Sequence, residues 1–265
     1  MLSRLAGLSR PVALAVCAVP VLALFAVAAL APLPFALAQP GLTANVLGSQ
    51  GGTKIIEITG APTRETRGEL RMTTIVATGP SADVGLGDVV DSWFRTDRAV
   101  MPREAVYPSG GSDKEIEQHN SAEMAESQDE ATRAALGFLG ESPSKVKVSL
   151  NLADVGGPSA GLLFSLGIID KLAGNGDGGD LTGGRSVAGT GTISADGTVG
   201  PVGGVALKTQ AAKRDGSSVF LVPKAECSDA KSELPSGLQL IPVTTLKDAV
   251  GSLRALSEGG TVPAC

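Results

Sequence analysis

Aromatic residues are scarce in this sequence, and basic residues are not in excess. Phe, Trp and Tyr make up 3% of its 265 residues, so a hydrophobic core must rest on Val, Leu, Ile and Ala. The net charge is −5, and Lys and Arg are dispersed among Asp and Glu. Nucleic-acid binding needs a basic surface, often with aromatic side chains that stack on bases. Because both are missing, we expect no nucleic-acid partner.

Metal ligands and nucleotide motifs are also missing. Outside the uncharged N-terminal stretch only one histidine, His119, and two cysteines are available, too few for the usual zinc sites, so we expect no metal. His119 lies in a strongly polar stretch and is better interpreted as a solvated helix residue than as the base of a Ser-His-Asp triad. Lys208-Thr209 resembles the end of a phosphate-binding loop, but Leu207 occupies the place of its glycine. We therefore expect no nucleotide or other cofactor.

One long apolar run is present near the N-terminus. Residues 11–38 carry no charge, and Val12–Ala31 alone would span about 30 Å as a helix, the thickness of a bilayer core. Arg4 and Arg10 precede the run, which places the N-terminus in the cytoplasm and the rest of the chain outside. The run is longer than the apolar segment of a usual signal peptide, so we favour a single-pass anchor in the cell membrane. A secreted protein, cleaved near Ala38, is the alternative.

The cysteines suit an exported domain. Cys17 lies in the apolar run, which leaves Cys227 and Cys265 as a pair in the rest of the chain. In an oxidising compartment such a pair favours a disulfide, here between the C-terminal tail and the domain. Two unpaired thiols are the alternative.

The remaining pattern predicts one α/β domain. We divide the chain into a cytoplasmic tail, the anchor or signal peptide, a linker, the domain and a C-terminal tail, at residues 1–10, 11–38, 39–53, 54–256 and 257–265. Alternating apolar residues predict strands at 54–60, 69–77, 145–152, 186–194, 197–199, 218–222 and 238–243. Helical periodicity and caps predict helices at 88–93, 112–139, 158–172, 205–214 and 245–256. The longest helix begins with a capping box at Ser112, and Phe138 is expected on its buried face. Residues 174–184 are interpreted as a solvated loop.

Ser159 is the first candidate for chemistry. It follows a predicted strand and the turn Gly156-Gly157-Pro158, and it opens an apolar helix. A hydroxyl at that place lies beside backbone N–H groups without helical partners and beside the positive end of the helix dipole, both of which can stabilise an oxyanion. Capping of the helix is the alternative, and it is the commoner role of a serine there.

Lys208 is the candidate for the base. Val205, Ala211 and Ala212 share its face of the predicted helix, which favours burial of the lysine. Burial disfavours the charged amine, and a pKa shift from about 10.4 to about 7–8 would cost roughly 3–5 kcal/mol. A neutral amine can accept the proton of a serine. Periodicity alone leaves open the alternative that Lys208 extends its amine to the surface.

The segments around these two residues resemble the proteolytic domain of Lon-type proteases. The resemblance covers Lys145–Leu256 well and Lys54–Leu139 more loosely, and the 49 positions from Ser159 to Lys208 are close to the family spacing. The matching segments are Gly157-Pro158-Ser159-Ala160-Gly161, Thr190-Gly191-Thr192-Ile193, the Pro-x-Gly-Gly-x-x-x-Lys pattern of Pro201–Lys208, Ala211–Arg214 and Phe220–Pro223.

The resemblance implies a Lon proteolytic-domain fold, a mixed sheet with packed helices, here preceded by one transmembrane helix. It implies an ATP-independent serine endopeptidase whose Ser159–Lys208 dyad acts on protein or peptide substrates among exported or envelope proteins. Gly157, Ala160 and Thr190 then support the oxyanion, the substrate or the lysine. Lon-type domains tend to form rings, so a homo-oligomer is a further option.

This sequence also departs from the family pattern. Gly156 stands where many Lon enzymes have an acidic residue, and Thr192 stands where glutamate is common. Bacterial membrane-anchored relatives without an ATPase domain usually carry a PDZ module, but Gly140 leads to Lys145 within a few residues and leaves no room for one. The alternative function is a catalytically silent Lon-like scaffold for binding or assembly at the membrane.

Overall fold

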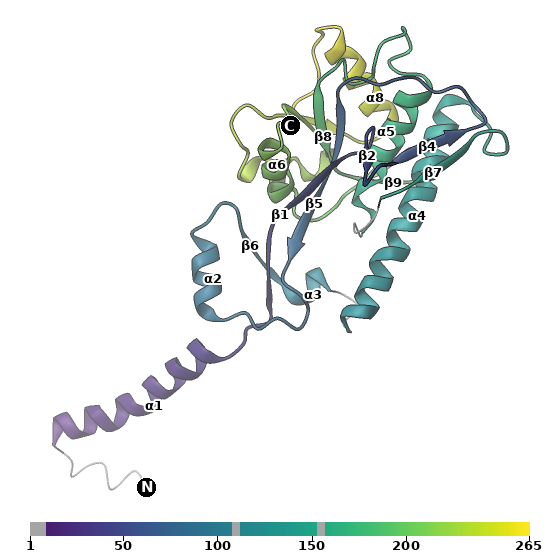
Figure 1. Ribbon diagram of the computed structural model, residues 1–265. Helices are drawn as coiled ribbons and strands as arrows, with labels where there is room; N and C mark the ends of the chain where they lie inside the picture. Colours follow the sequence, from purple (N-terminus) through teal and green to yellow (C-terminus); the bar gives the residue numbers. More distant parts are fainter. Residues whose placement is uncertain (1–8, 108–111, 153–156) are drawn as a thin grey trace.

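The computed structural model describes residues 9–107, 112–152 and 157–265, and its centre is a mixed six-stranded sheet (Figure 1). The strand order is β12-β11-β8-β5-β1-β6. The four strands from β12 to β5 run parallel to their neighbours, whereas β1 is antiparallel to both β5 and β6. The bounds are β1 (Phe35–Asn45), β5 (Glu69–Ala77), β6 (Ala99–Pro102), β8 (Ser186–Gly189), β11 (Val219–Pro223) and β12 (Gln239–Val243). The expected α/β fold with a mixed sheet is confirmed.

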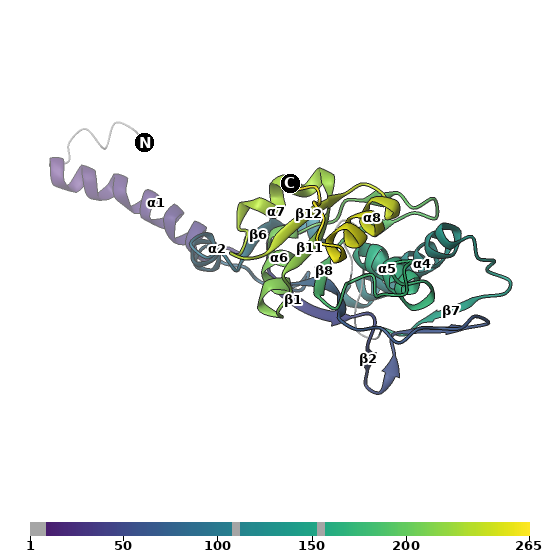
Figure 2. The same ribbon diagram turned by 90° about the horizontal axis from the view of Figure 1, so that it is seen from above.

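Helices cover both faces of this sheet, as Figure 2 shows from above. Along β11, Val219 and Leu221 belong to one buried cluster, whereas Phe220 and Val222 belong to the other. The first cluster packs under α4 (Asp113–Leu139), α5 (Gly161–Leu172) and α8 (Leu246–Ser257); the second packs under α6 (Val205–Arg214) and α7 (Cys227–Ser232). Side chains alternate along a strand, so β11 is apolar on both faces because helices lie on both.

Smaller elements complete the domain. Three two-stranded ribbons pair β2 (Ser49–Gln50) with β3 (Thr53–Lys54), β4 (Ile56–Thr59) with β7 (Lys147–Leu150), and β9 (Thr192–Ile193) with β10 (Val199–Gly200). The short helices are α2 (Leu86–Trp93), α3 (Arg103–Val106) and the 3₁₀ turns η2 (Pro158–Ala160) and η3 (Lys224–Glu226).

Most predicted elements are found, with two differences of detail. Ser112 caps α4 through a capping box, as expected, but Phe138 near the end of this helix is exposed. The stretch predicted as one strand over 186–194 is broken at Thr190 and Gly191. Its first part joins the large sheet as β8, and only β9 forms the hairpin with β10. Gly191 has a φ of 152°, a backbone conformation that residues with a side chain rarely adopt, and the chain turns out of the sheet there.

The prediction that residues 39–53 form a linker is wrong. Residues 35–45 form β1, which lies between β5 and β6 in the sheet and buries Ala36 and Ala38. The sequence conceals this strand because Pro40-Gly41 interrupts it and few β-branched residues mark it. The pairing with β5 shifts register between Pro40 and Thr43, and this irregularity accommodates the interruption.

The apolar run forms α1 (Arg10–Leu30), a helix that projects from the domain (Figure 1). Its window Arg10–Val27 has a mean hydropathy of 2.2 and is not buried, so the helix is long and apolar enough to cross a membrane. A signal sequence would have the same properties. Most of the predicted cytoplasmic tail and Gly156 lie outside the described residues.

Candidate active site

The candidate site lies where β5 continues past the end of β8. β8 pairs with Glu69–Met72 of β5 and ends at Gly189, whereas β5 runs on to Ala77. The chain leaves β8 through Thr190. Beside the second half of β5, η2 and the beginning of α6 come together around one cavity. The difference in length between two neighbouring strands therefore makes the space for the site.

Ser159 lies in η2, the turn that leads into the buried helix α5. Gly157, at the start of this turn, has a φ of 88°, a backbone conformation that strains other residues. The N–H of Gly191 donates to the carbonyl of Ser159 at 3.0 Å, and Oγ of Ser127 on α4 donates to the carbonyl of Pro158 at 2.9 Å. These two bonds hold the turn on both sides. Ser159 itself is half-buried and Ala160 is buried.

Lys208 is in the first turns of α6 and is 3% exposed. The helix begins after Gly204, whose φ of 67° is left-handed, and packs its inner face on β1 and β5. Asp229 of α7 accepts a hydrogen bond from the N–H of Val205 at 3.0 Å, which satisfies a free donor at the helix start. The alternative that Lys208 extends to the surface is wrong, because the helix face that it shares with Val205 is turned inward.

Burial lowers the pKa of Lys208 to about 8, against an ordinary value of 10.5. The charges of Glu226 and Asp229 act in the opposite direction and raise it. At pH 7, about a tenth of such amines is uncharged, because pH 7 lies one unit below a pKa of about 8. Lys208 can therefore act as a base without an unusual solvent pH.

Thr190 connects the lysine to the serine segment. Nζ of Lys208 donates to Oγ1 of Thr190 at 3.1 Å, and that hydroxyl donates in turn to the carbonyl of Ser159 at 3.3 Å. Thr190 is fully buried, so both bonds are protected from water. These two hydrogen bonds fix the amine of Lys208 relative to the turn that carries Ser159.

Ser159 and Lys208 line the same cavity of about 240 Å³. Its other walls come from the second half of β5, the turn η2, β9 and the loop before α6, namely Thr74, Ile75, Pro158, Thr192, Pro201, Val202 and Gly203. The cavity thus brings a half-buried hydroxyl and a buried amine to one space that a substrate group could enter. That arrangement is suited to activation of a serine by a neutral lysine.

The wall formed by Val202 and the start of α6 is supported by η3 and α7. Glu226 faces the backbone N–H of Val202, and burial raises the pKa of this carboxyl. Among the described residues, its Oε2 is buried without a hydrogen-bond partner. The next residue, Cys227, forms a disulfide with Cys265, with 5.3 Å between the Cα atoms. The C-terminal tail is thus joined to the segment that supports the site. No sequence signal pointed to Glu226 or Asp229.

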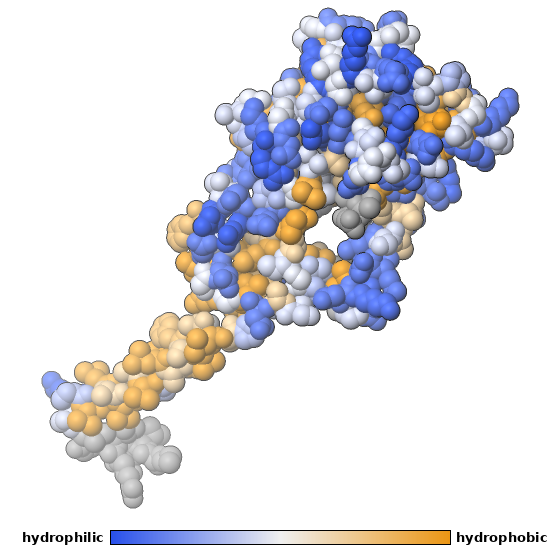
Figure 3. Space-filling view, in the orientation of Figure 1, coloured by the Kyte–Doolittle hydropathy of each residue, from blue (hydrophilic) through white to orange (hydrophobic). Residues whose placement is uncertain are grey.

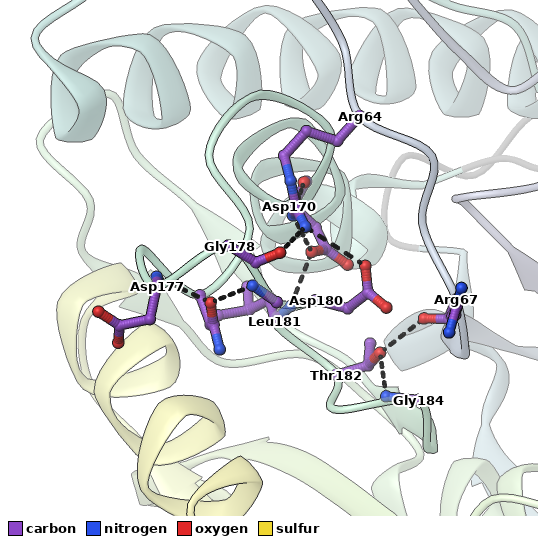
Figure 4. Close-up of polar contacts among 11 residues, drawn as sticks. Arg64, Arg67, Asp170, Asp177, Gly178, Asp180, Leu181, Thr182 and Gly184 are labelled. Carbon is purple, nitrogen blue, oxygen red and sulfur yellow. Dashed lines mark hydrogen bonds and ion pairs between the residues drawn. The ribbon is translucent and has the colours of Figure 1, made fainter.

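Other candidates from the sequence lie elsewhere. His119 is on the exposed side of α4, with its Nε2 3.3 Å from Glu123, one helical turn away. The loop at 174–184 is less solvated than expected, because Asp170 and Arg64 hold it (Figure 4). Leu181 donates its N–H to Oδ1 of Asp170 at 2.7 Å, and Arg64 donates to the carbonyl of Gly178 at 2.8 Å. Within the described ranges, no three His, Cys, Asp or Glu side chains are grouped to hold a metal ion.

Comparisons with known proteins give one consistent result. A family model for the Lon protease (S16) C-terminal proteolytic domain matches residues 118–254. The chain is 29% identical over 133 residues to Lon protease 2 of Bacillus subtilis, which is 49% of this chain and 23% of that protein. It is 37% identical over 97 residues to the Lon protease of Chloroflexus aggregans, covering 35% of this chain and 11% of the relative. It is 37% identical over 98 residues to that of Azospirillum brasilense, covering 36% and 11%. The chain therefore spans less than a quarter of the length of these relatives.

Proposed function

The chain belongs to the Lon protease (S16) proteolytic-domain family, a family of serine peptidases, and from this premise we propose that it is a serine endopeptidase with a Ser159–Lys208 dyad. One observation carries the proposal. Ser159 and Lys208 lie 49 positions apart in the sequence and on different elements, yet they line one cavity, and the lysine is 3% exposed. A buried lysine at such a cavity, with its pKa lowered, is a recurrent form of general base.

The mechanism follows from these positions. Ser159 Oγ attacks the carbonyl carbon of a peptide bond while Nζ of neutral Lys208 takes the hydroxyl proton. The backbone N–H groups of Ser159 and Ala160 stabilise the oxyanion, assisted by the dipole of α5. The ammonium of Lys208 then gives its proton to the leaving amine, and an acyl-enzyme forms. Water, deprotonated by the same amine, hydrolyses the ester and restores both side chains.

Thr190 has a positioning role in this mechanism. Its hydroxyl accepts from Nζ of Lys208 and is fixed in turn by the carbonyl of Ser159. The amine keeps a lone pair for the serine proton only when it is neutral, and one defined hydrogen bond limits the directions in which that lone pair can point. Thr190 therefore orients the base.

We propose further that the enzyme works without ATP on exported or envelope proteins. The family match covers a proteolytic domain. The segment ending in Lys208-Thr209 resembles a phosphate-binding loop, but Leu207 stands in the place of the glycine that such a loop requires. Oxidised Cys227 and Cys265 suit a compartment outside the cytoplasm. Hydrolysis of an unfolded protein at equal rate with ATP and after removal of nucleotide by apyrase would support this part, and a requirement for ATP would contradict it.

The anchored form is preferred to the secreted one, and the reason lies in β1. Ala38 is buried and pairs with Ala77 of β5 and Ala99 of β6. Cleavage near Ala38 would remove the first part of this strand and its pairing with β6. We therefore propose that α1 stays attached as a membrane anchor and that the folded domain begins near Phe35. Intact mass and flotation with membranes test this directly.

The catalytic proposal is tested with Ser159→Ala and a fluorophosphonate probe. We expect wild type to be labelled at Ser159 and the variant to lose hydrolysis of an unfolded protein by as much as about 10⁶-fold. Thermal unfolding of the variant, expected to be unchanged, shows that the fold is intact. A folded wild type without label or hydrolysis would favour the silent scaffold, and the size of the detergent-solubilised chain then tells whether it self-associates.

A further inference from the structure

Helix α2 carries an apolar stripe that faces away from the domain. Leu86, Val90, Trp93 and Phe94 are 41%, 48%, 76% and 84% exposed. Their spacing of four, three and one residues places them on one side of a helix. On the opposite side, Ser92 is buried. Single exposed apolar residues are ordinary, but an amphipathic helix turns its apolar stripe inward when water is the only solvent. The outward stripe therefore calls for a partner.

The position of α2 indicates which partner. The chain leaves α1 at Leu30, and three residues later the N–H of Leu33 donates to the carbonyl of Val84 at 2.8 Å, two residues before α2 begins. Arg103 holds the same place: its N–H donates to the carbonyl of Pro34 at 3.0 Å and its Nη2 to that of Ala82 at 2.7 Å. Helix α2 is thus fixed beside the C-terminal end of α1, as Figure 1 shows.

The two apolar surfaces are neighbours. In Figure 3 the apolar surface of α1 is followed by further apolar surface on the nearest part of the domain. Helix α2 has eight residues and is about 12 Å long, too short to cross a bilayer. Tryptophan and phenylalanine at the end of such a helix suit the boundary between lipid headgroups and acyl chains. Asp91, also on α2, is paired with Arg95 and Arg98, each at 3.1 Å, so its charge is balanced by two basic side chains.

We propose that α2 lies on the outer surface of the same bilayer that α1 crosses, with Leu86, Val90, Trp93 and Phe94 inserted at the headgroup boundary. This inference rests on the proposed anchor. Two attachment points, one helix across the membrane and one upon it, prevent the domain from rotating freely about α1. The protease domain is then held in one orientation relative to the lipid surface.

Trp93 is the sole tryptophan of the sequence, so tryptophan fluorescence reports on α2 alone. The full chain is reconstituted into phosphatidylcholine vesicles, with and without lipids brominated along the acyl chains. Contact with lipid predicts that brominated vesicles reduce the Trp93 emission to about half or less and that aqueous iodide quenches it weakly. The combined variant L86S/V90S/F94S keeps Trp93 and α1, and should lose the bromine quenching and become accessible to iodide. Its activity on a short soluble peptide, expected to equal that of wild type, is the folding control.

Two results would overturn the inference while leaving the anchor intact. One is a chain that floats with the vesicles but whose Trp93 is quenched by iodide and not by bromine. The other is a Trp93 shielded from both quenchers, with shielding that grows with protein density, because a second copy of the chain would then cover the stripe. A chain that does not float at all contradicts the anchor and this inference together, while the Ser159 label and hydrolysis still report on the catalytic proposal.

Discussion

Lys208 and Asp170 are the charged side chains that the described part of the chain buries most completely, at 3% and 0% exposure, and their surroundings differ. Lys208 lies on α6 over one face of the sheet and Asp170 on α5 over the other. Burial shifts both pKa values toward the neutral form, to about 8 for the lysine and about 6 for the carboxyl. Lys208 opens on a cavity, whereas Asp170 is covered by the 174–184 loop and Arg64.

A shifted pKa alone therefore does not mark a catalytic residue. The same desolvation acts on both groups, but only the lysine faces a space that also contains a hydroxyl. Asp170 instead uses its carboxylate to satisfy the backbone of a glycine-rich loop. Access to a substrate, and not burial, separates the proposed catalytic group from the structural one.

Within this comparison, removal of each buried group by mutation should have the largest effect. Lys208→Met removes the proposed base and should lower kcat/KM by about 10²–10⁴-fold. Its thermal stability should be unchanged or higher, because a buried charge has been removed.

Asp170→Ala should lower the free energy of unfolding by about 2–4 kcal/mol, because the N–H of Leu181 loses its acceptor and a cavity is left. Peptide hydrolysis and chemical denaturation of both variants measure the contrast. Loss of hydrolysis in folded Asp170→Ala at low temperature would erase the distinction.

The two regions should also differ in their response to pH. Hydrolysis requires neutral Lys208, so kcat/KM should rise about tenfold per unit up to a midpoint near the pKa of about 8 and then level off. The pKa of Asp170 is raised in the folded state from 3.8 to about 6, so the stability that it contributes is present below about pH 4 and is lost as pH rises to about 6. This loss is at most about 3 kcal/mol.

Asp170→Asn is the matched control for the pH experiment. It should flatten the stability change between about pH 4 and 6 without moving the midpoint of hydrolysis near 8. A shift of the hydrolysis midpoint in this variant would show that Lys208 and Asp170 are coupled across the sheet. It would contradict the expectation that the two groups titrate independently.

A smaller effect is expected from Glu226, which lies on the lysine side and raises the pKa of Lys208. Glu226→Gln keeps an acceptor toward Val202 but removes the charge, so the midpoint of kcat/KM should move to lower pH by less than about one unit. Glu233→Gln, on the same segment but exposed, should leave the midpoint unchanged. An unmoved midpoint in Glu226→Gln would mean that Glu226 has a purely structural role.

The sequence predicts some of these features better than others, for physical reasons. Helices α4, α5, α6 and α8 carry caps or apolar faces that are visible in the residues themselves, and the Ser159 and Lys208 segments have a distinctive pattern. β1 is hidden because its pairing depends on β5 and β6 and not on its own composition. The cavity arises from the unequal lengths of β5 and β8, and the supporting role of Glu226 from packing of η3, neither of which has a local signal.

The short passage from α1 to β1 has a consequence for substrate choice. Four residues, 31–34, separate the two elements, and fully extended they reach about 14 Å. Leu33 and Pro34 are moreover tied into the domain. In the proposed anchored form, no long tether would separate the domain from α1, so the domain itself would set the distance between the candidate site and the lipid surface. Polypeptides would have to be delivered to it at the lipid surface, as newly translocated or membrane-bound chains are.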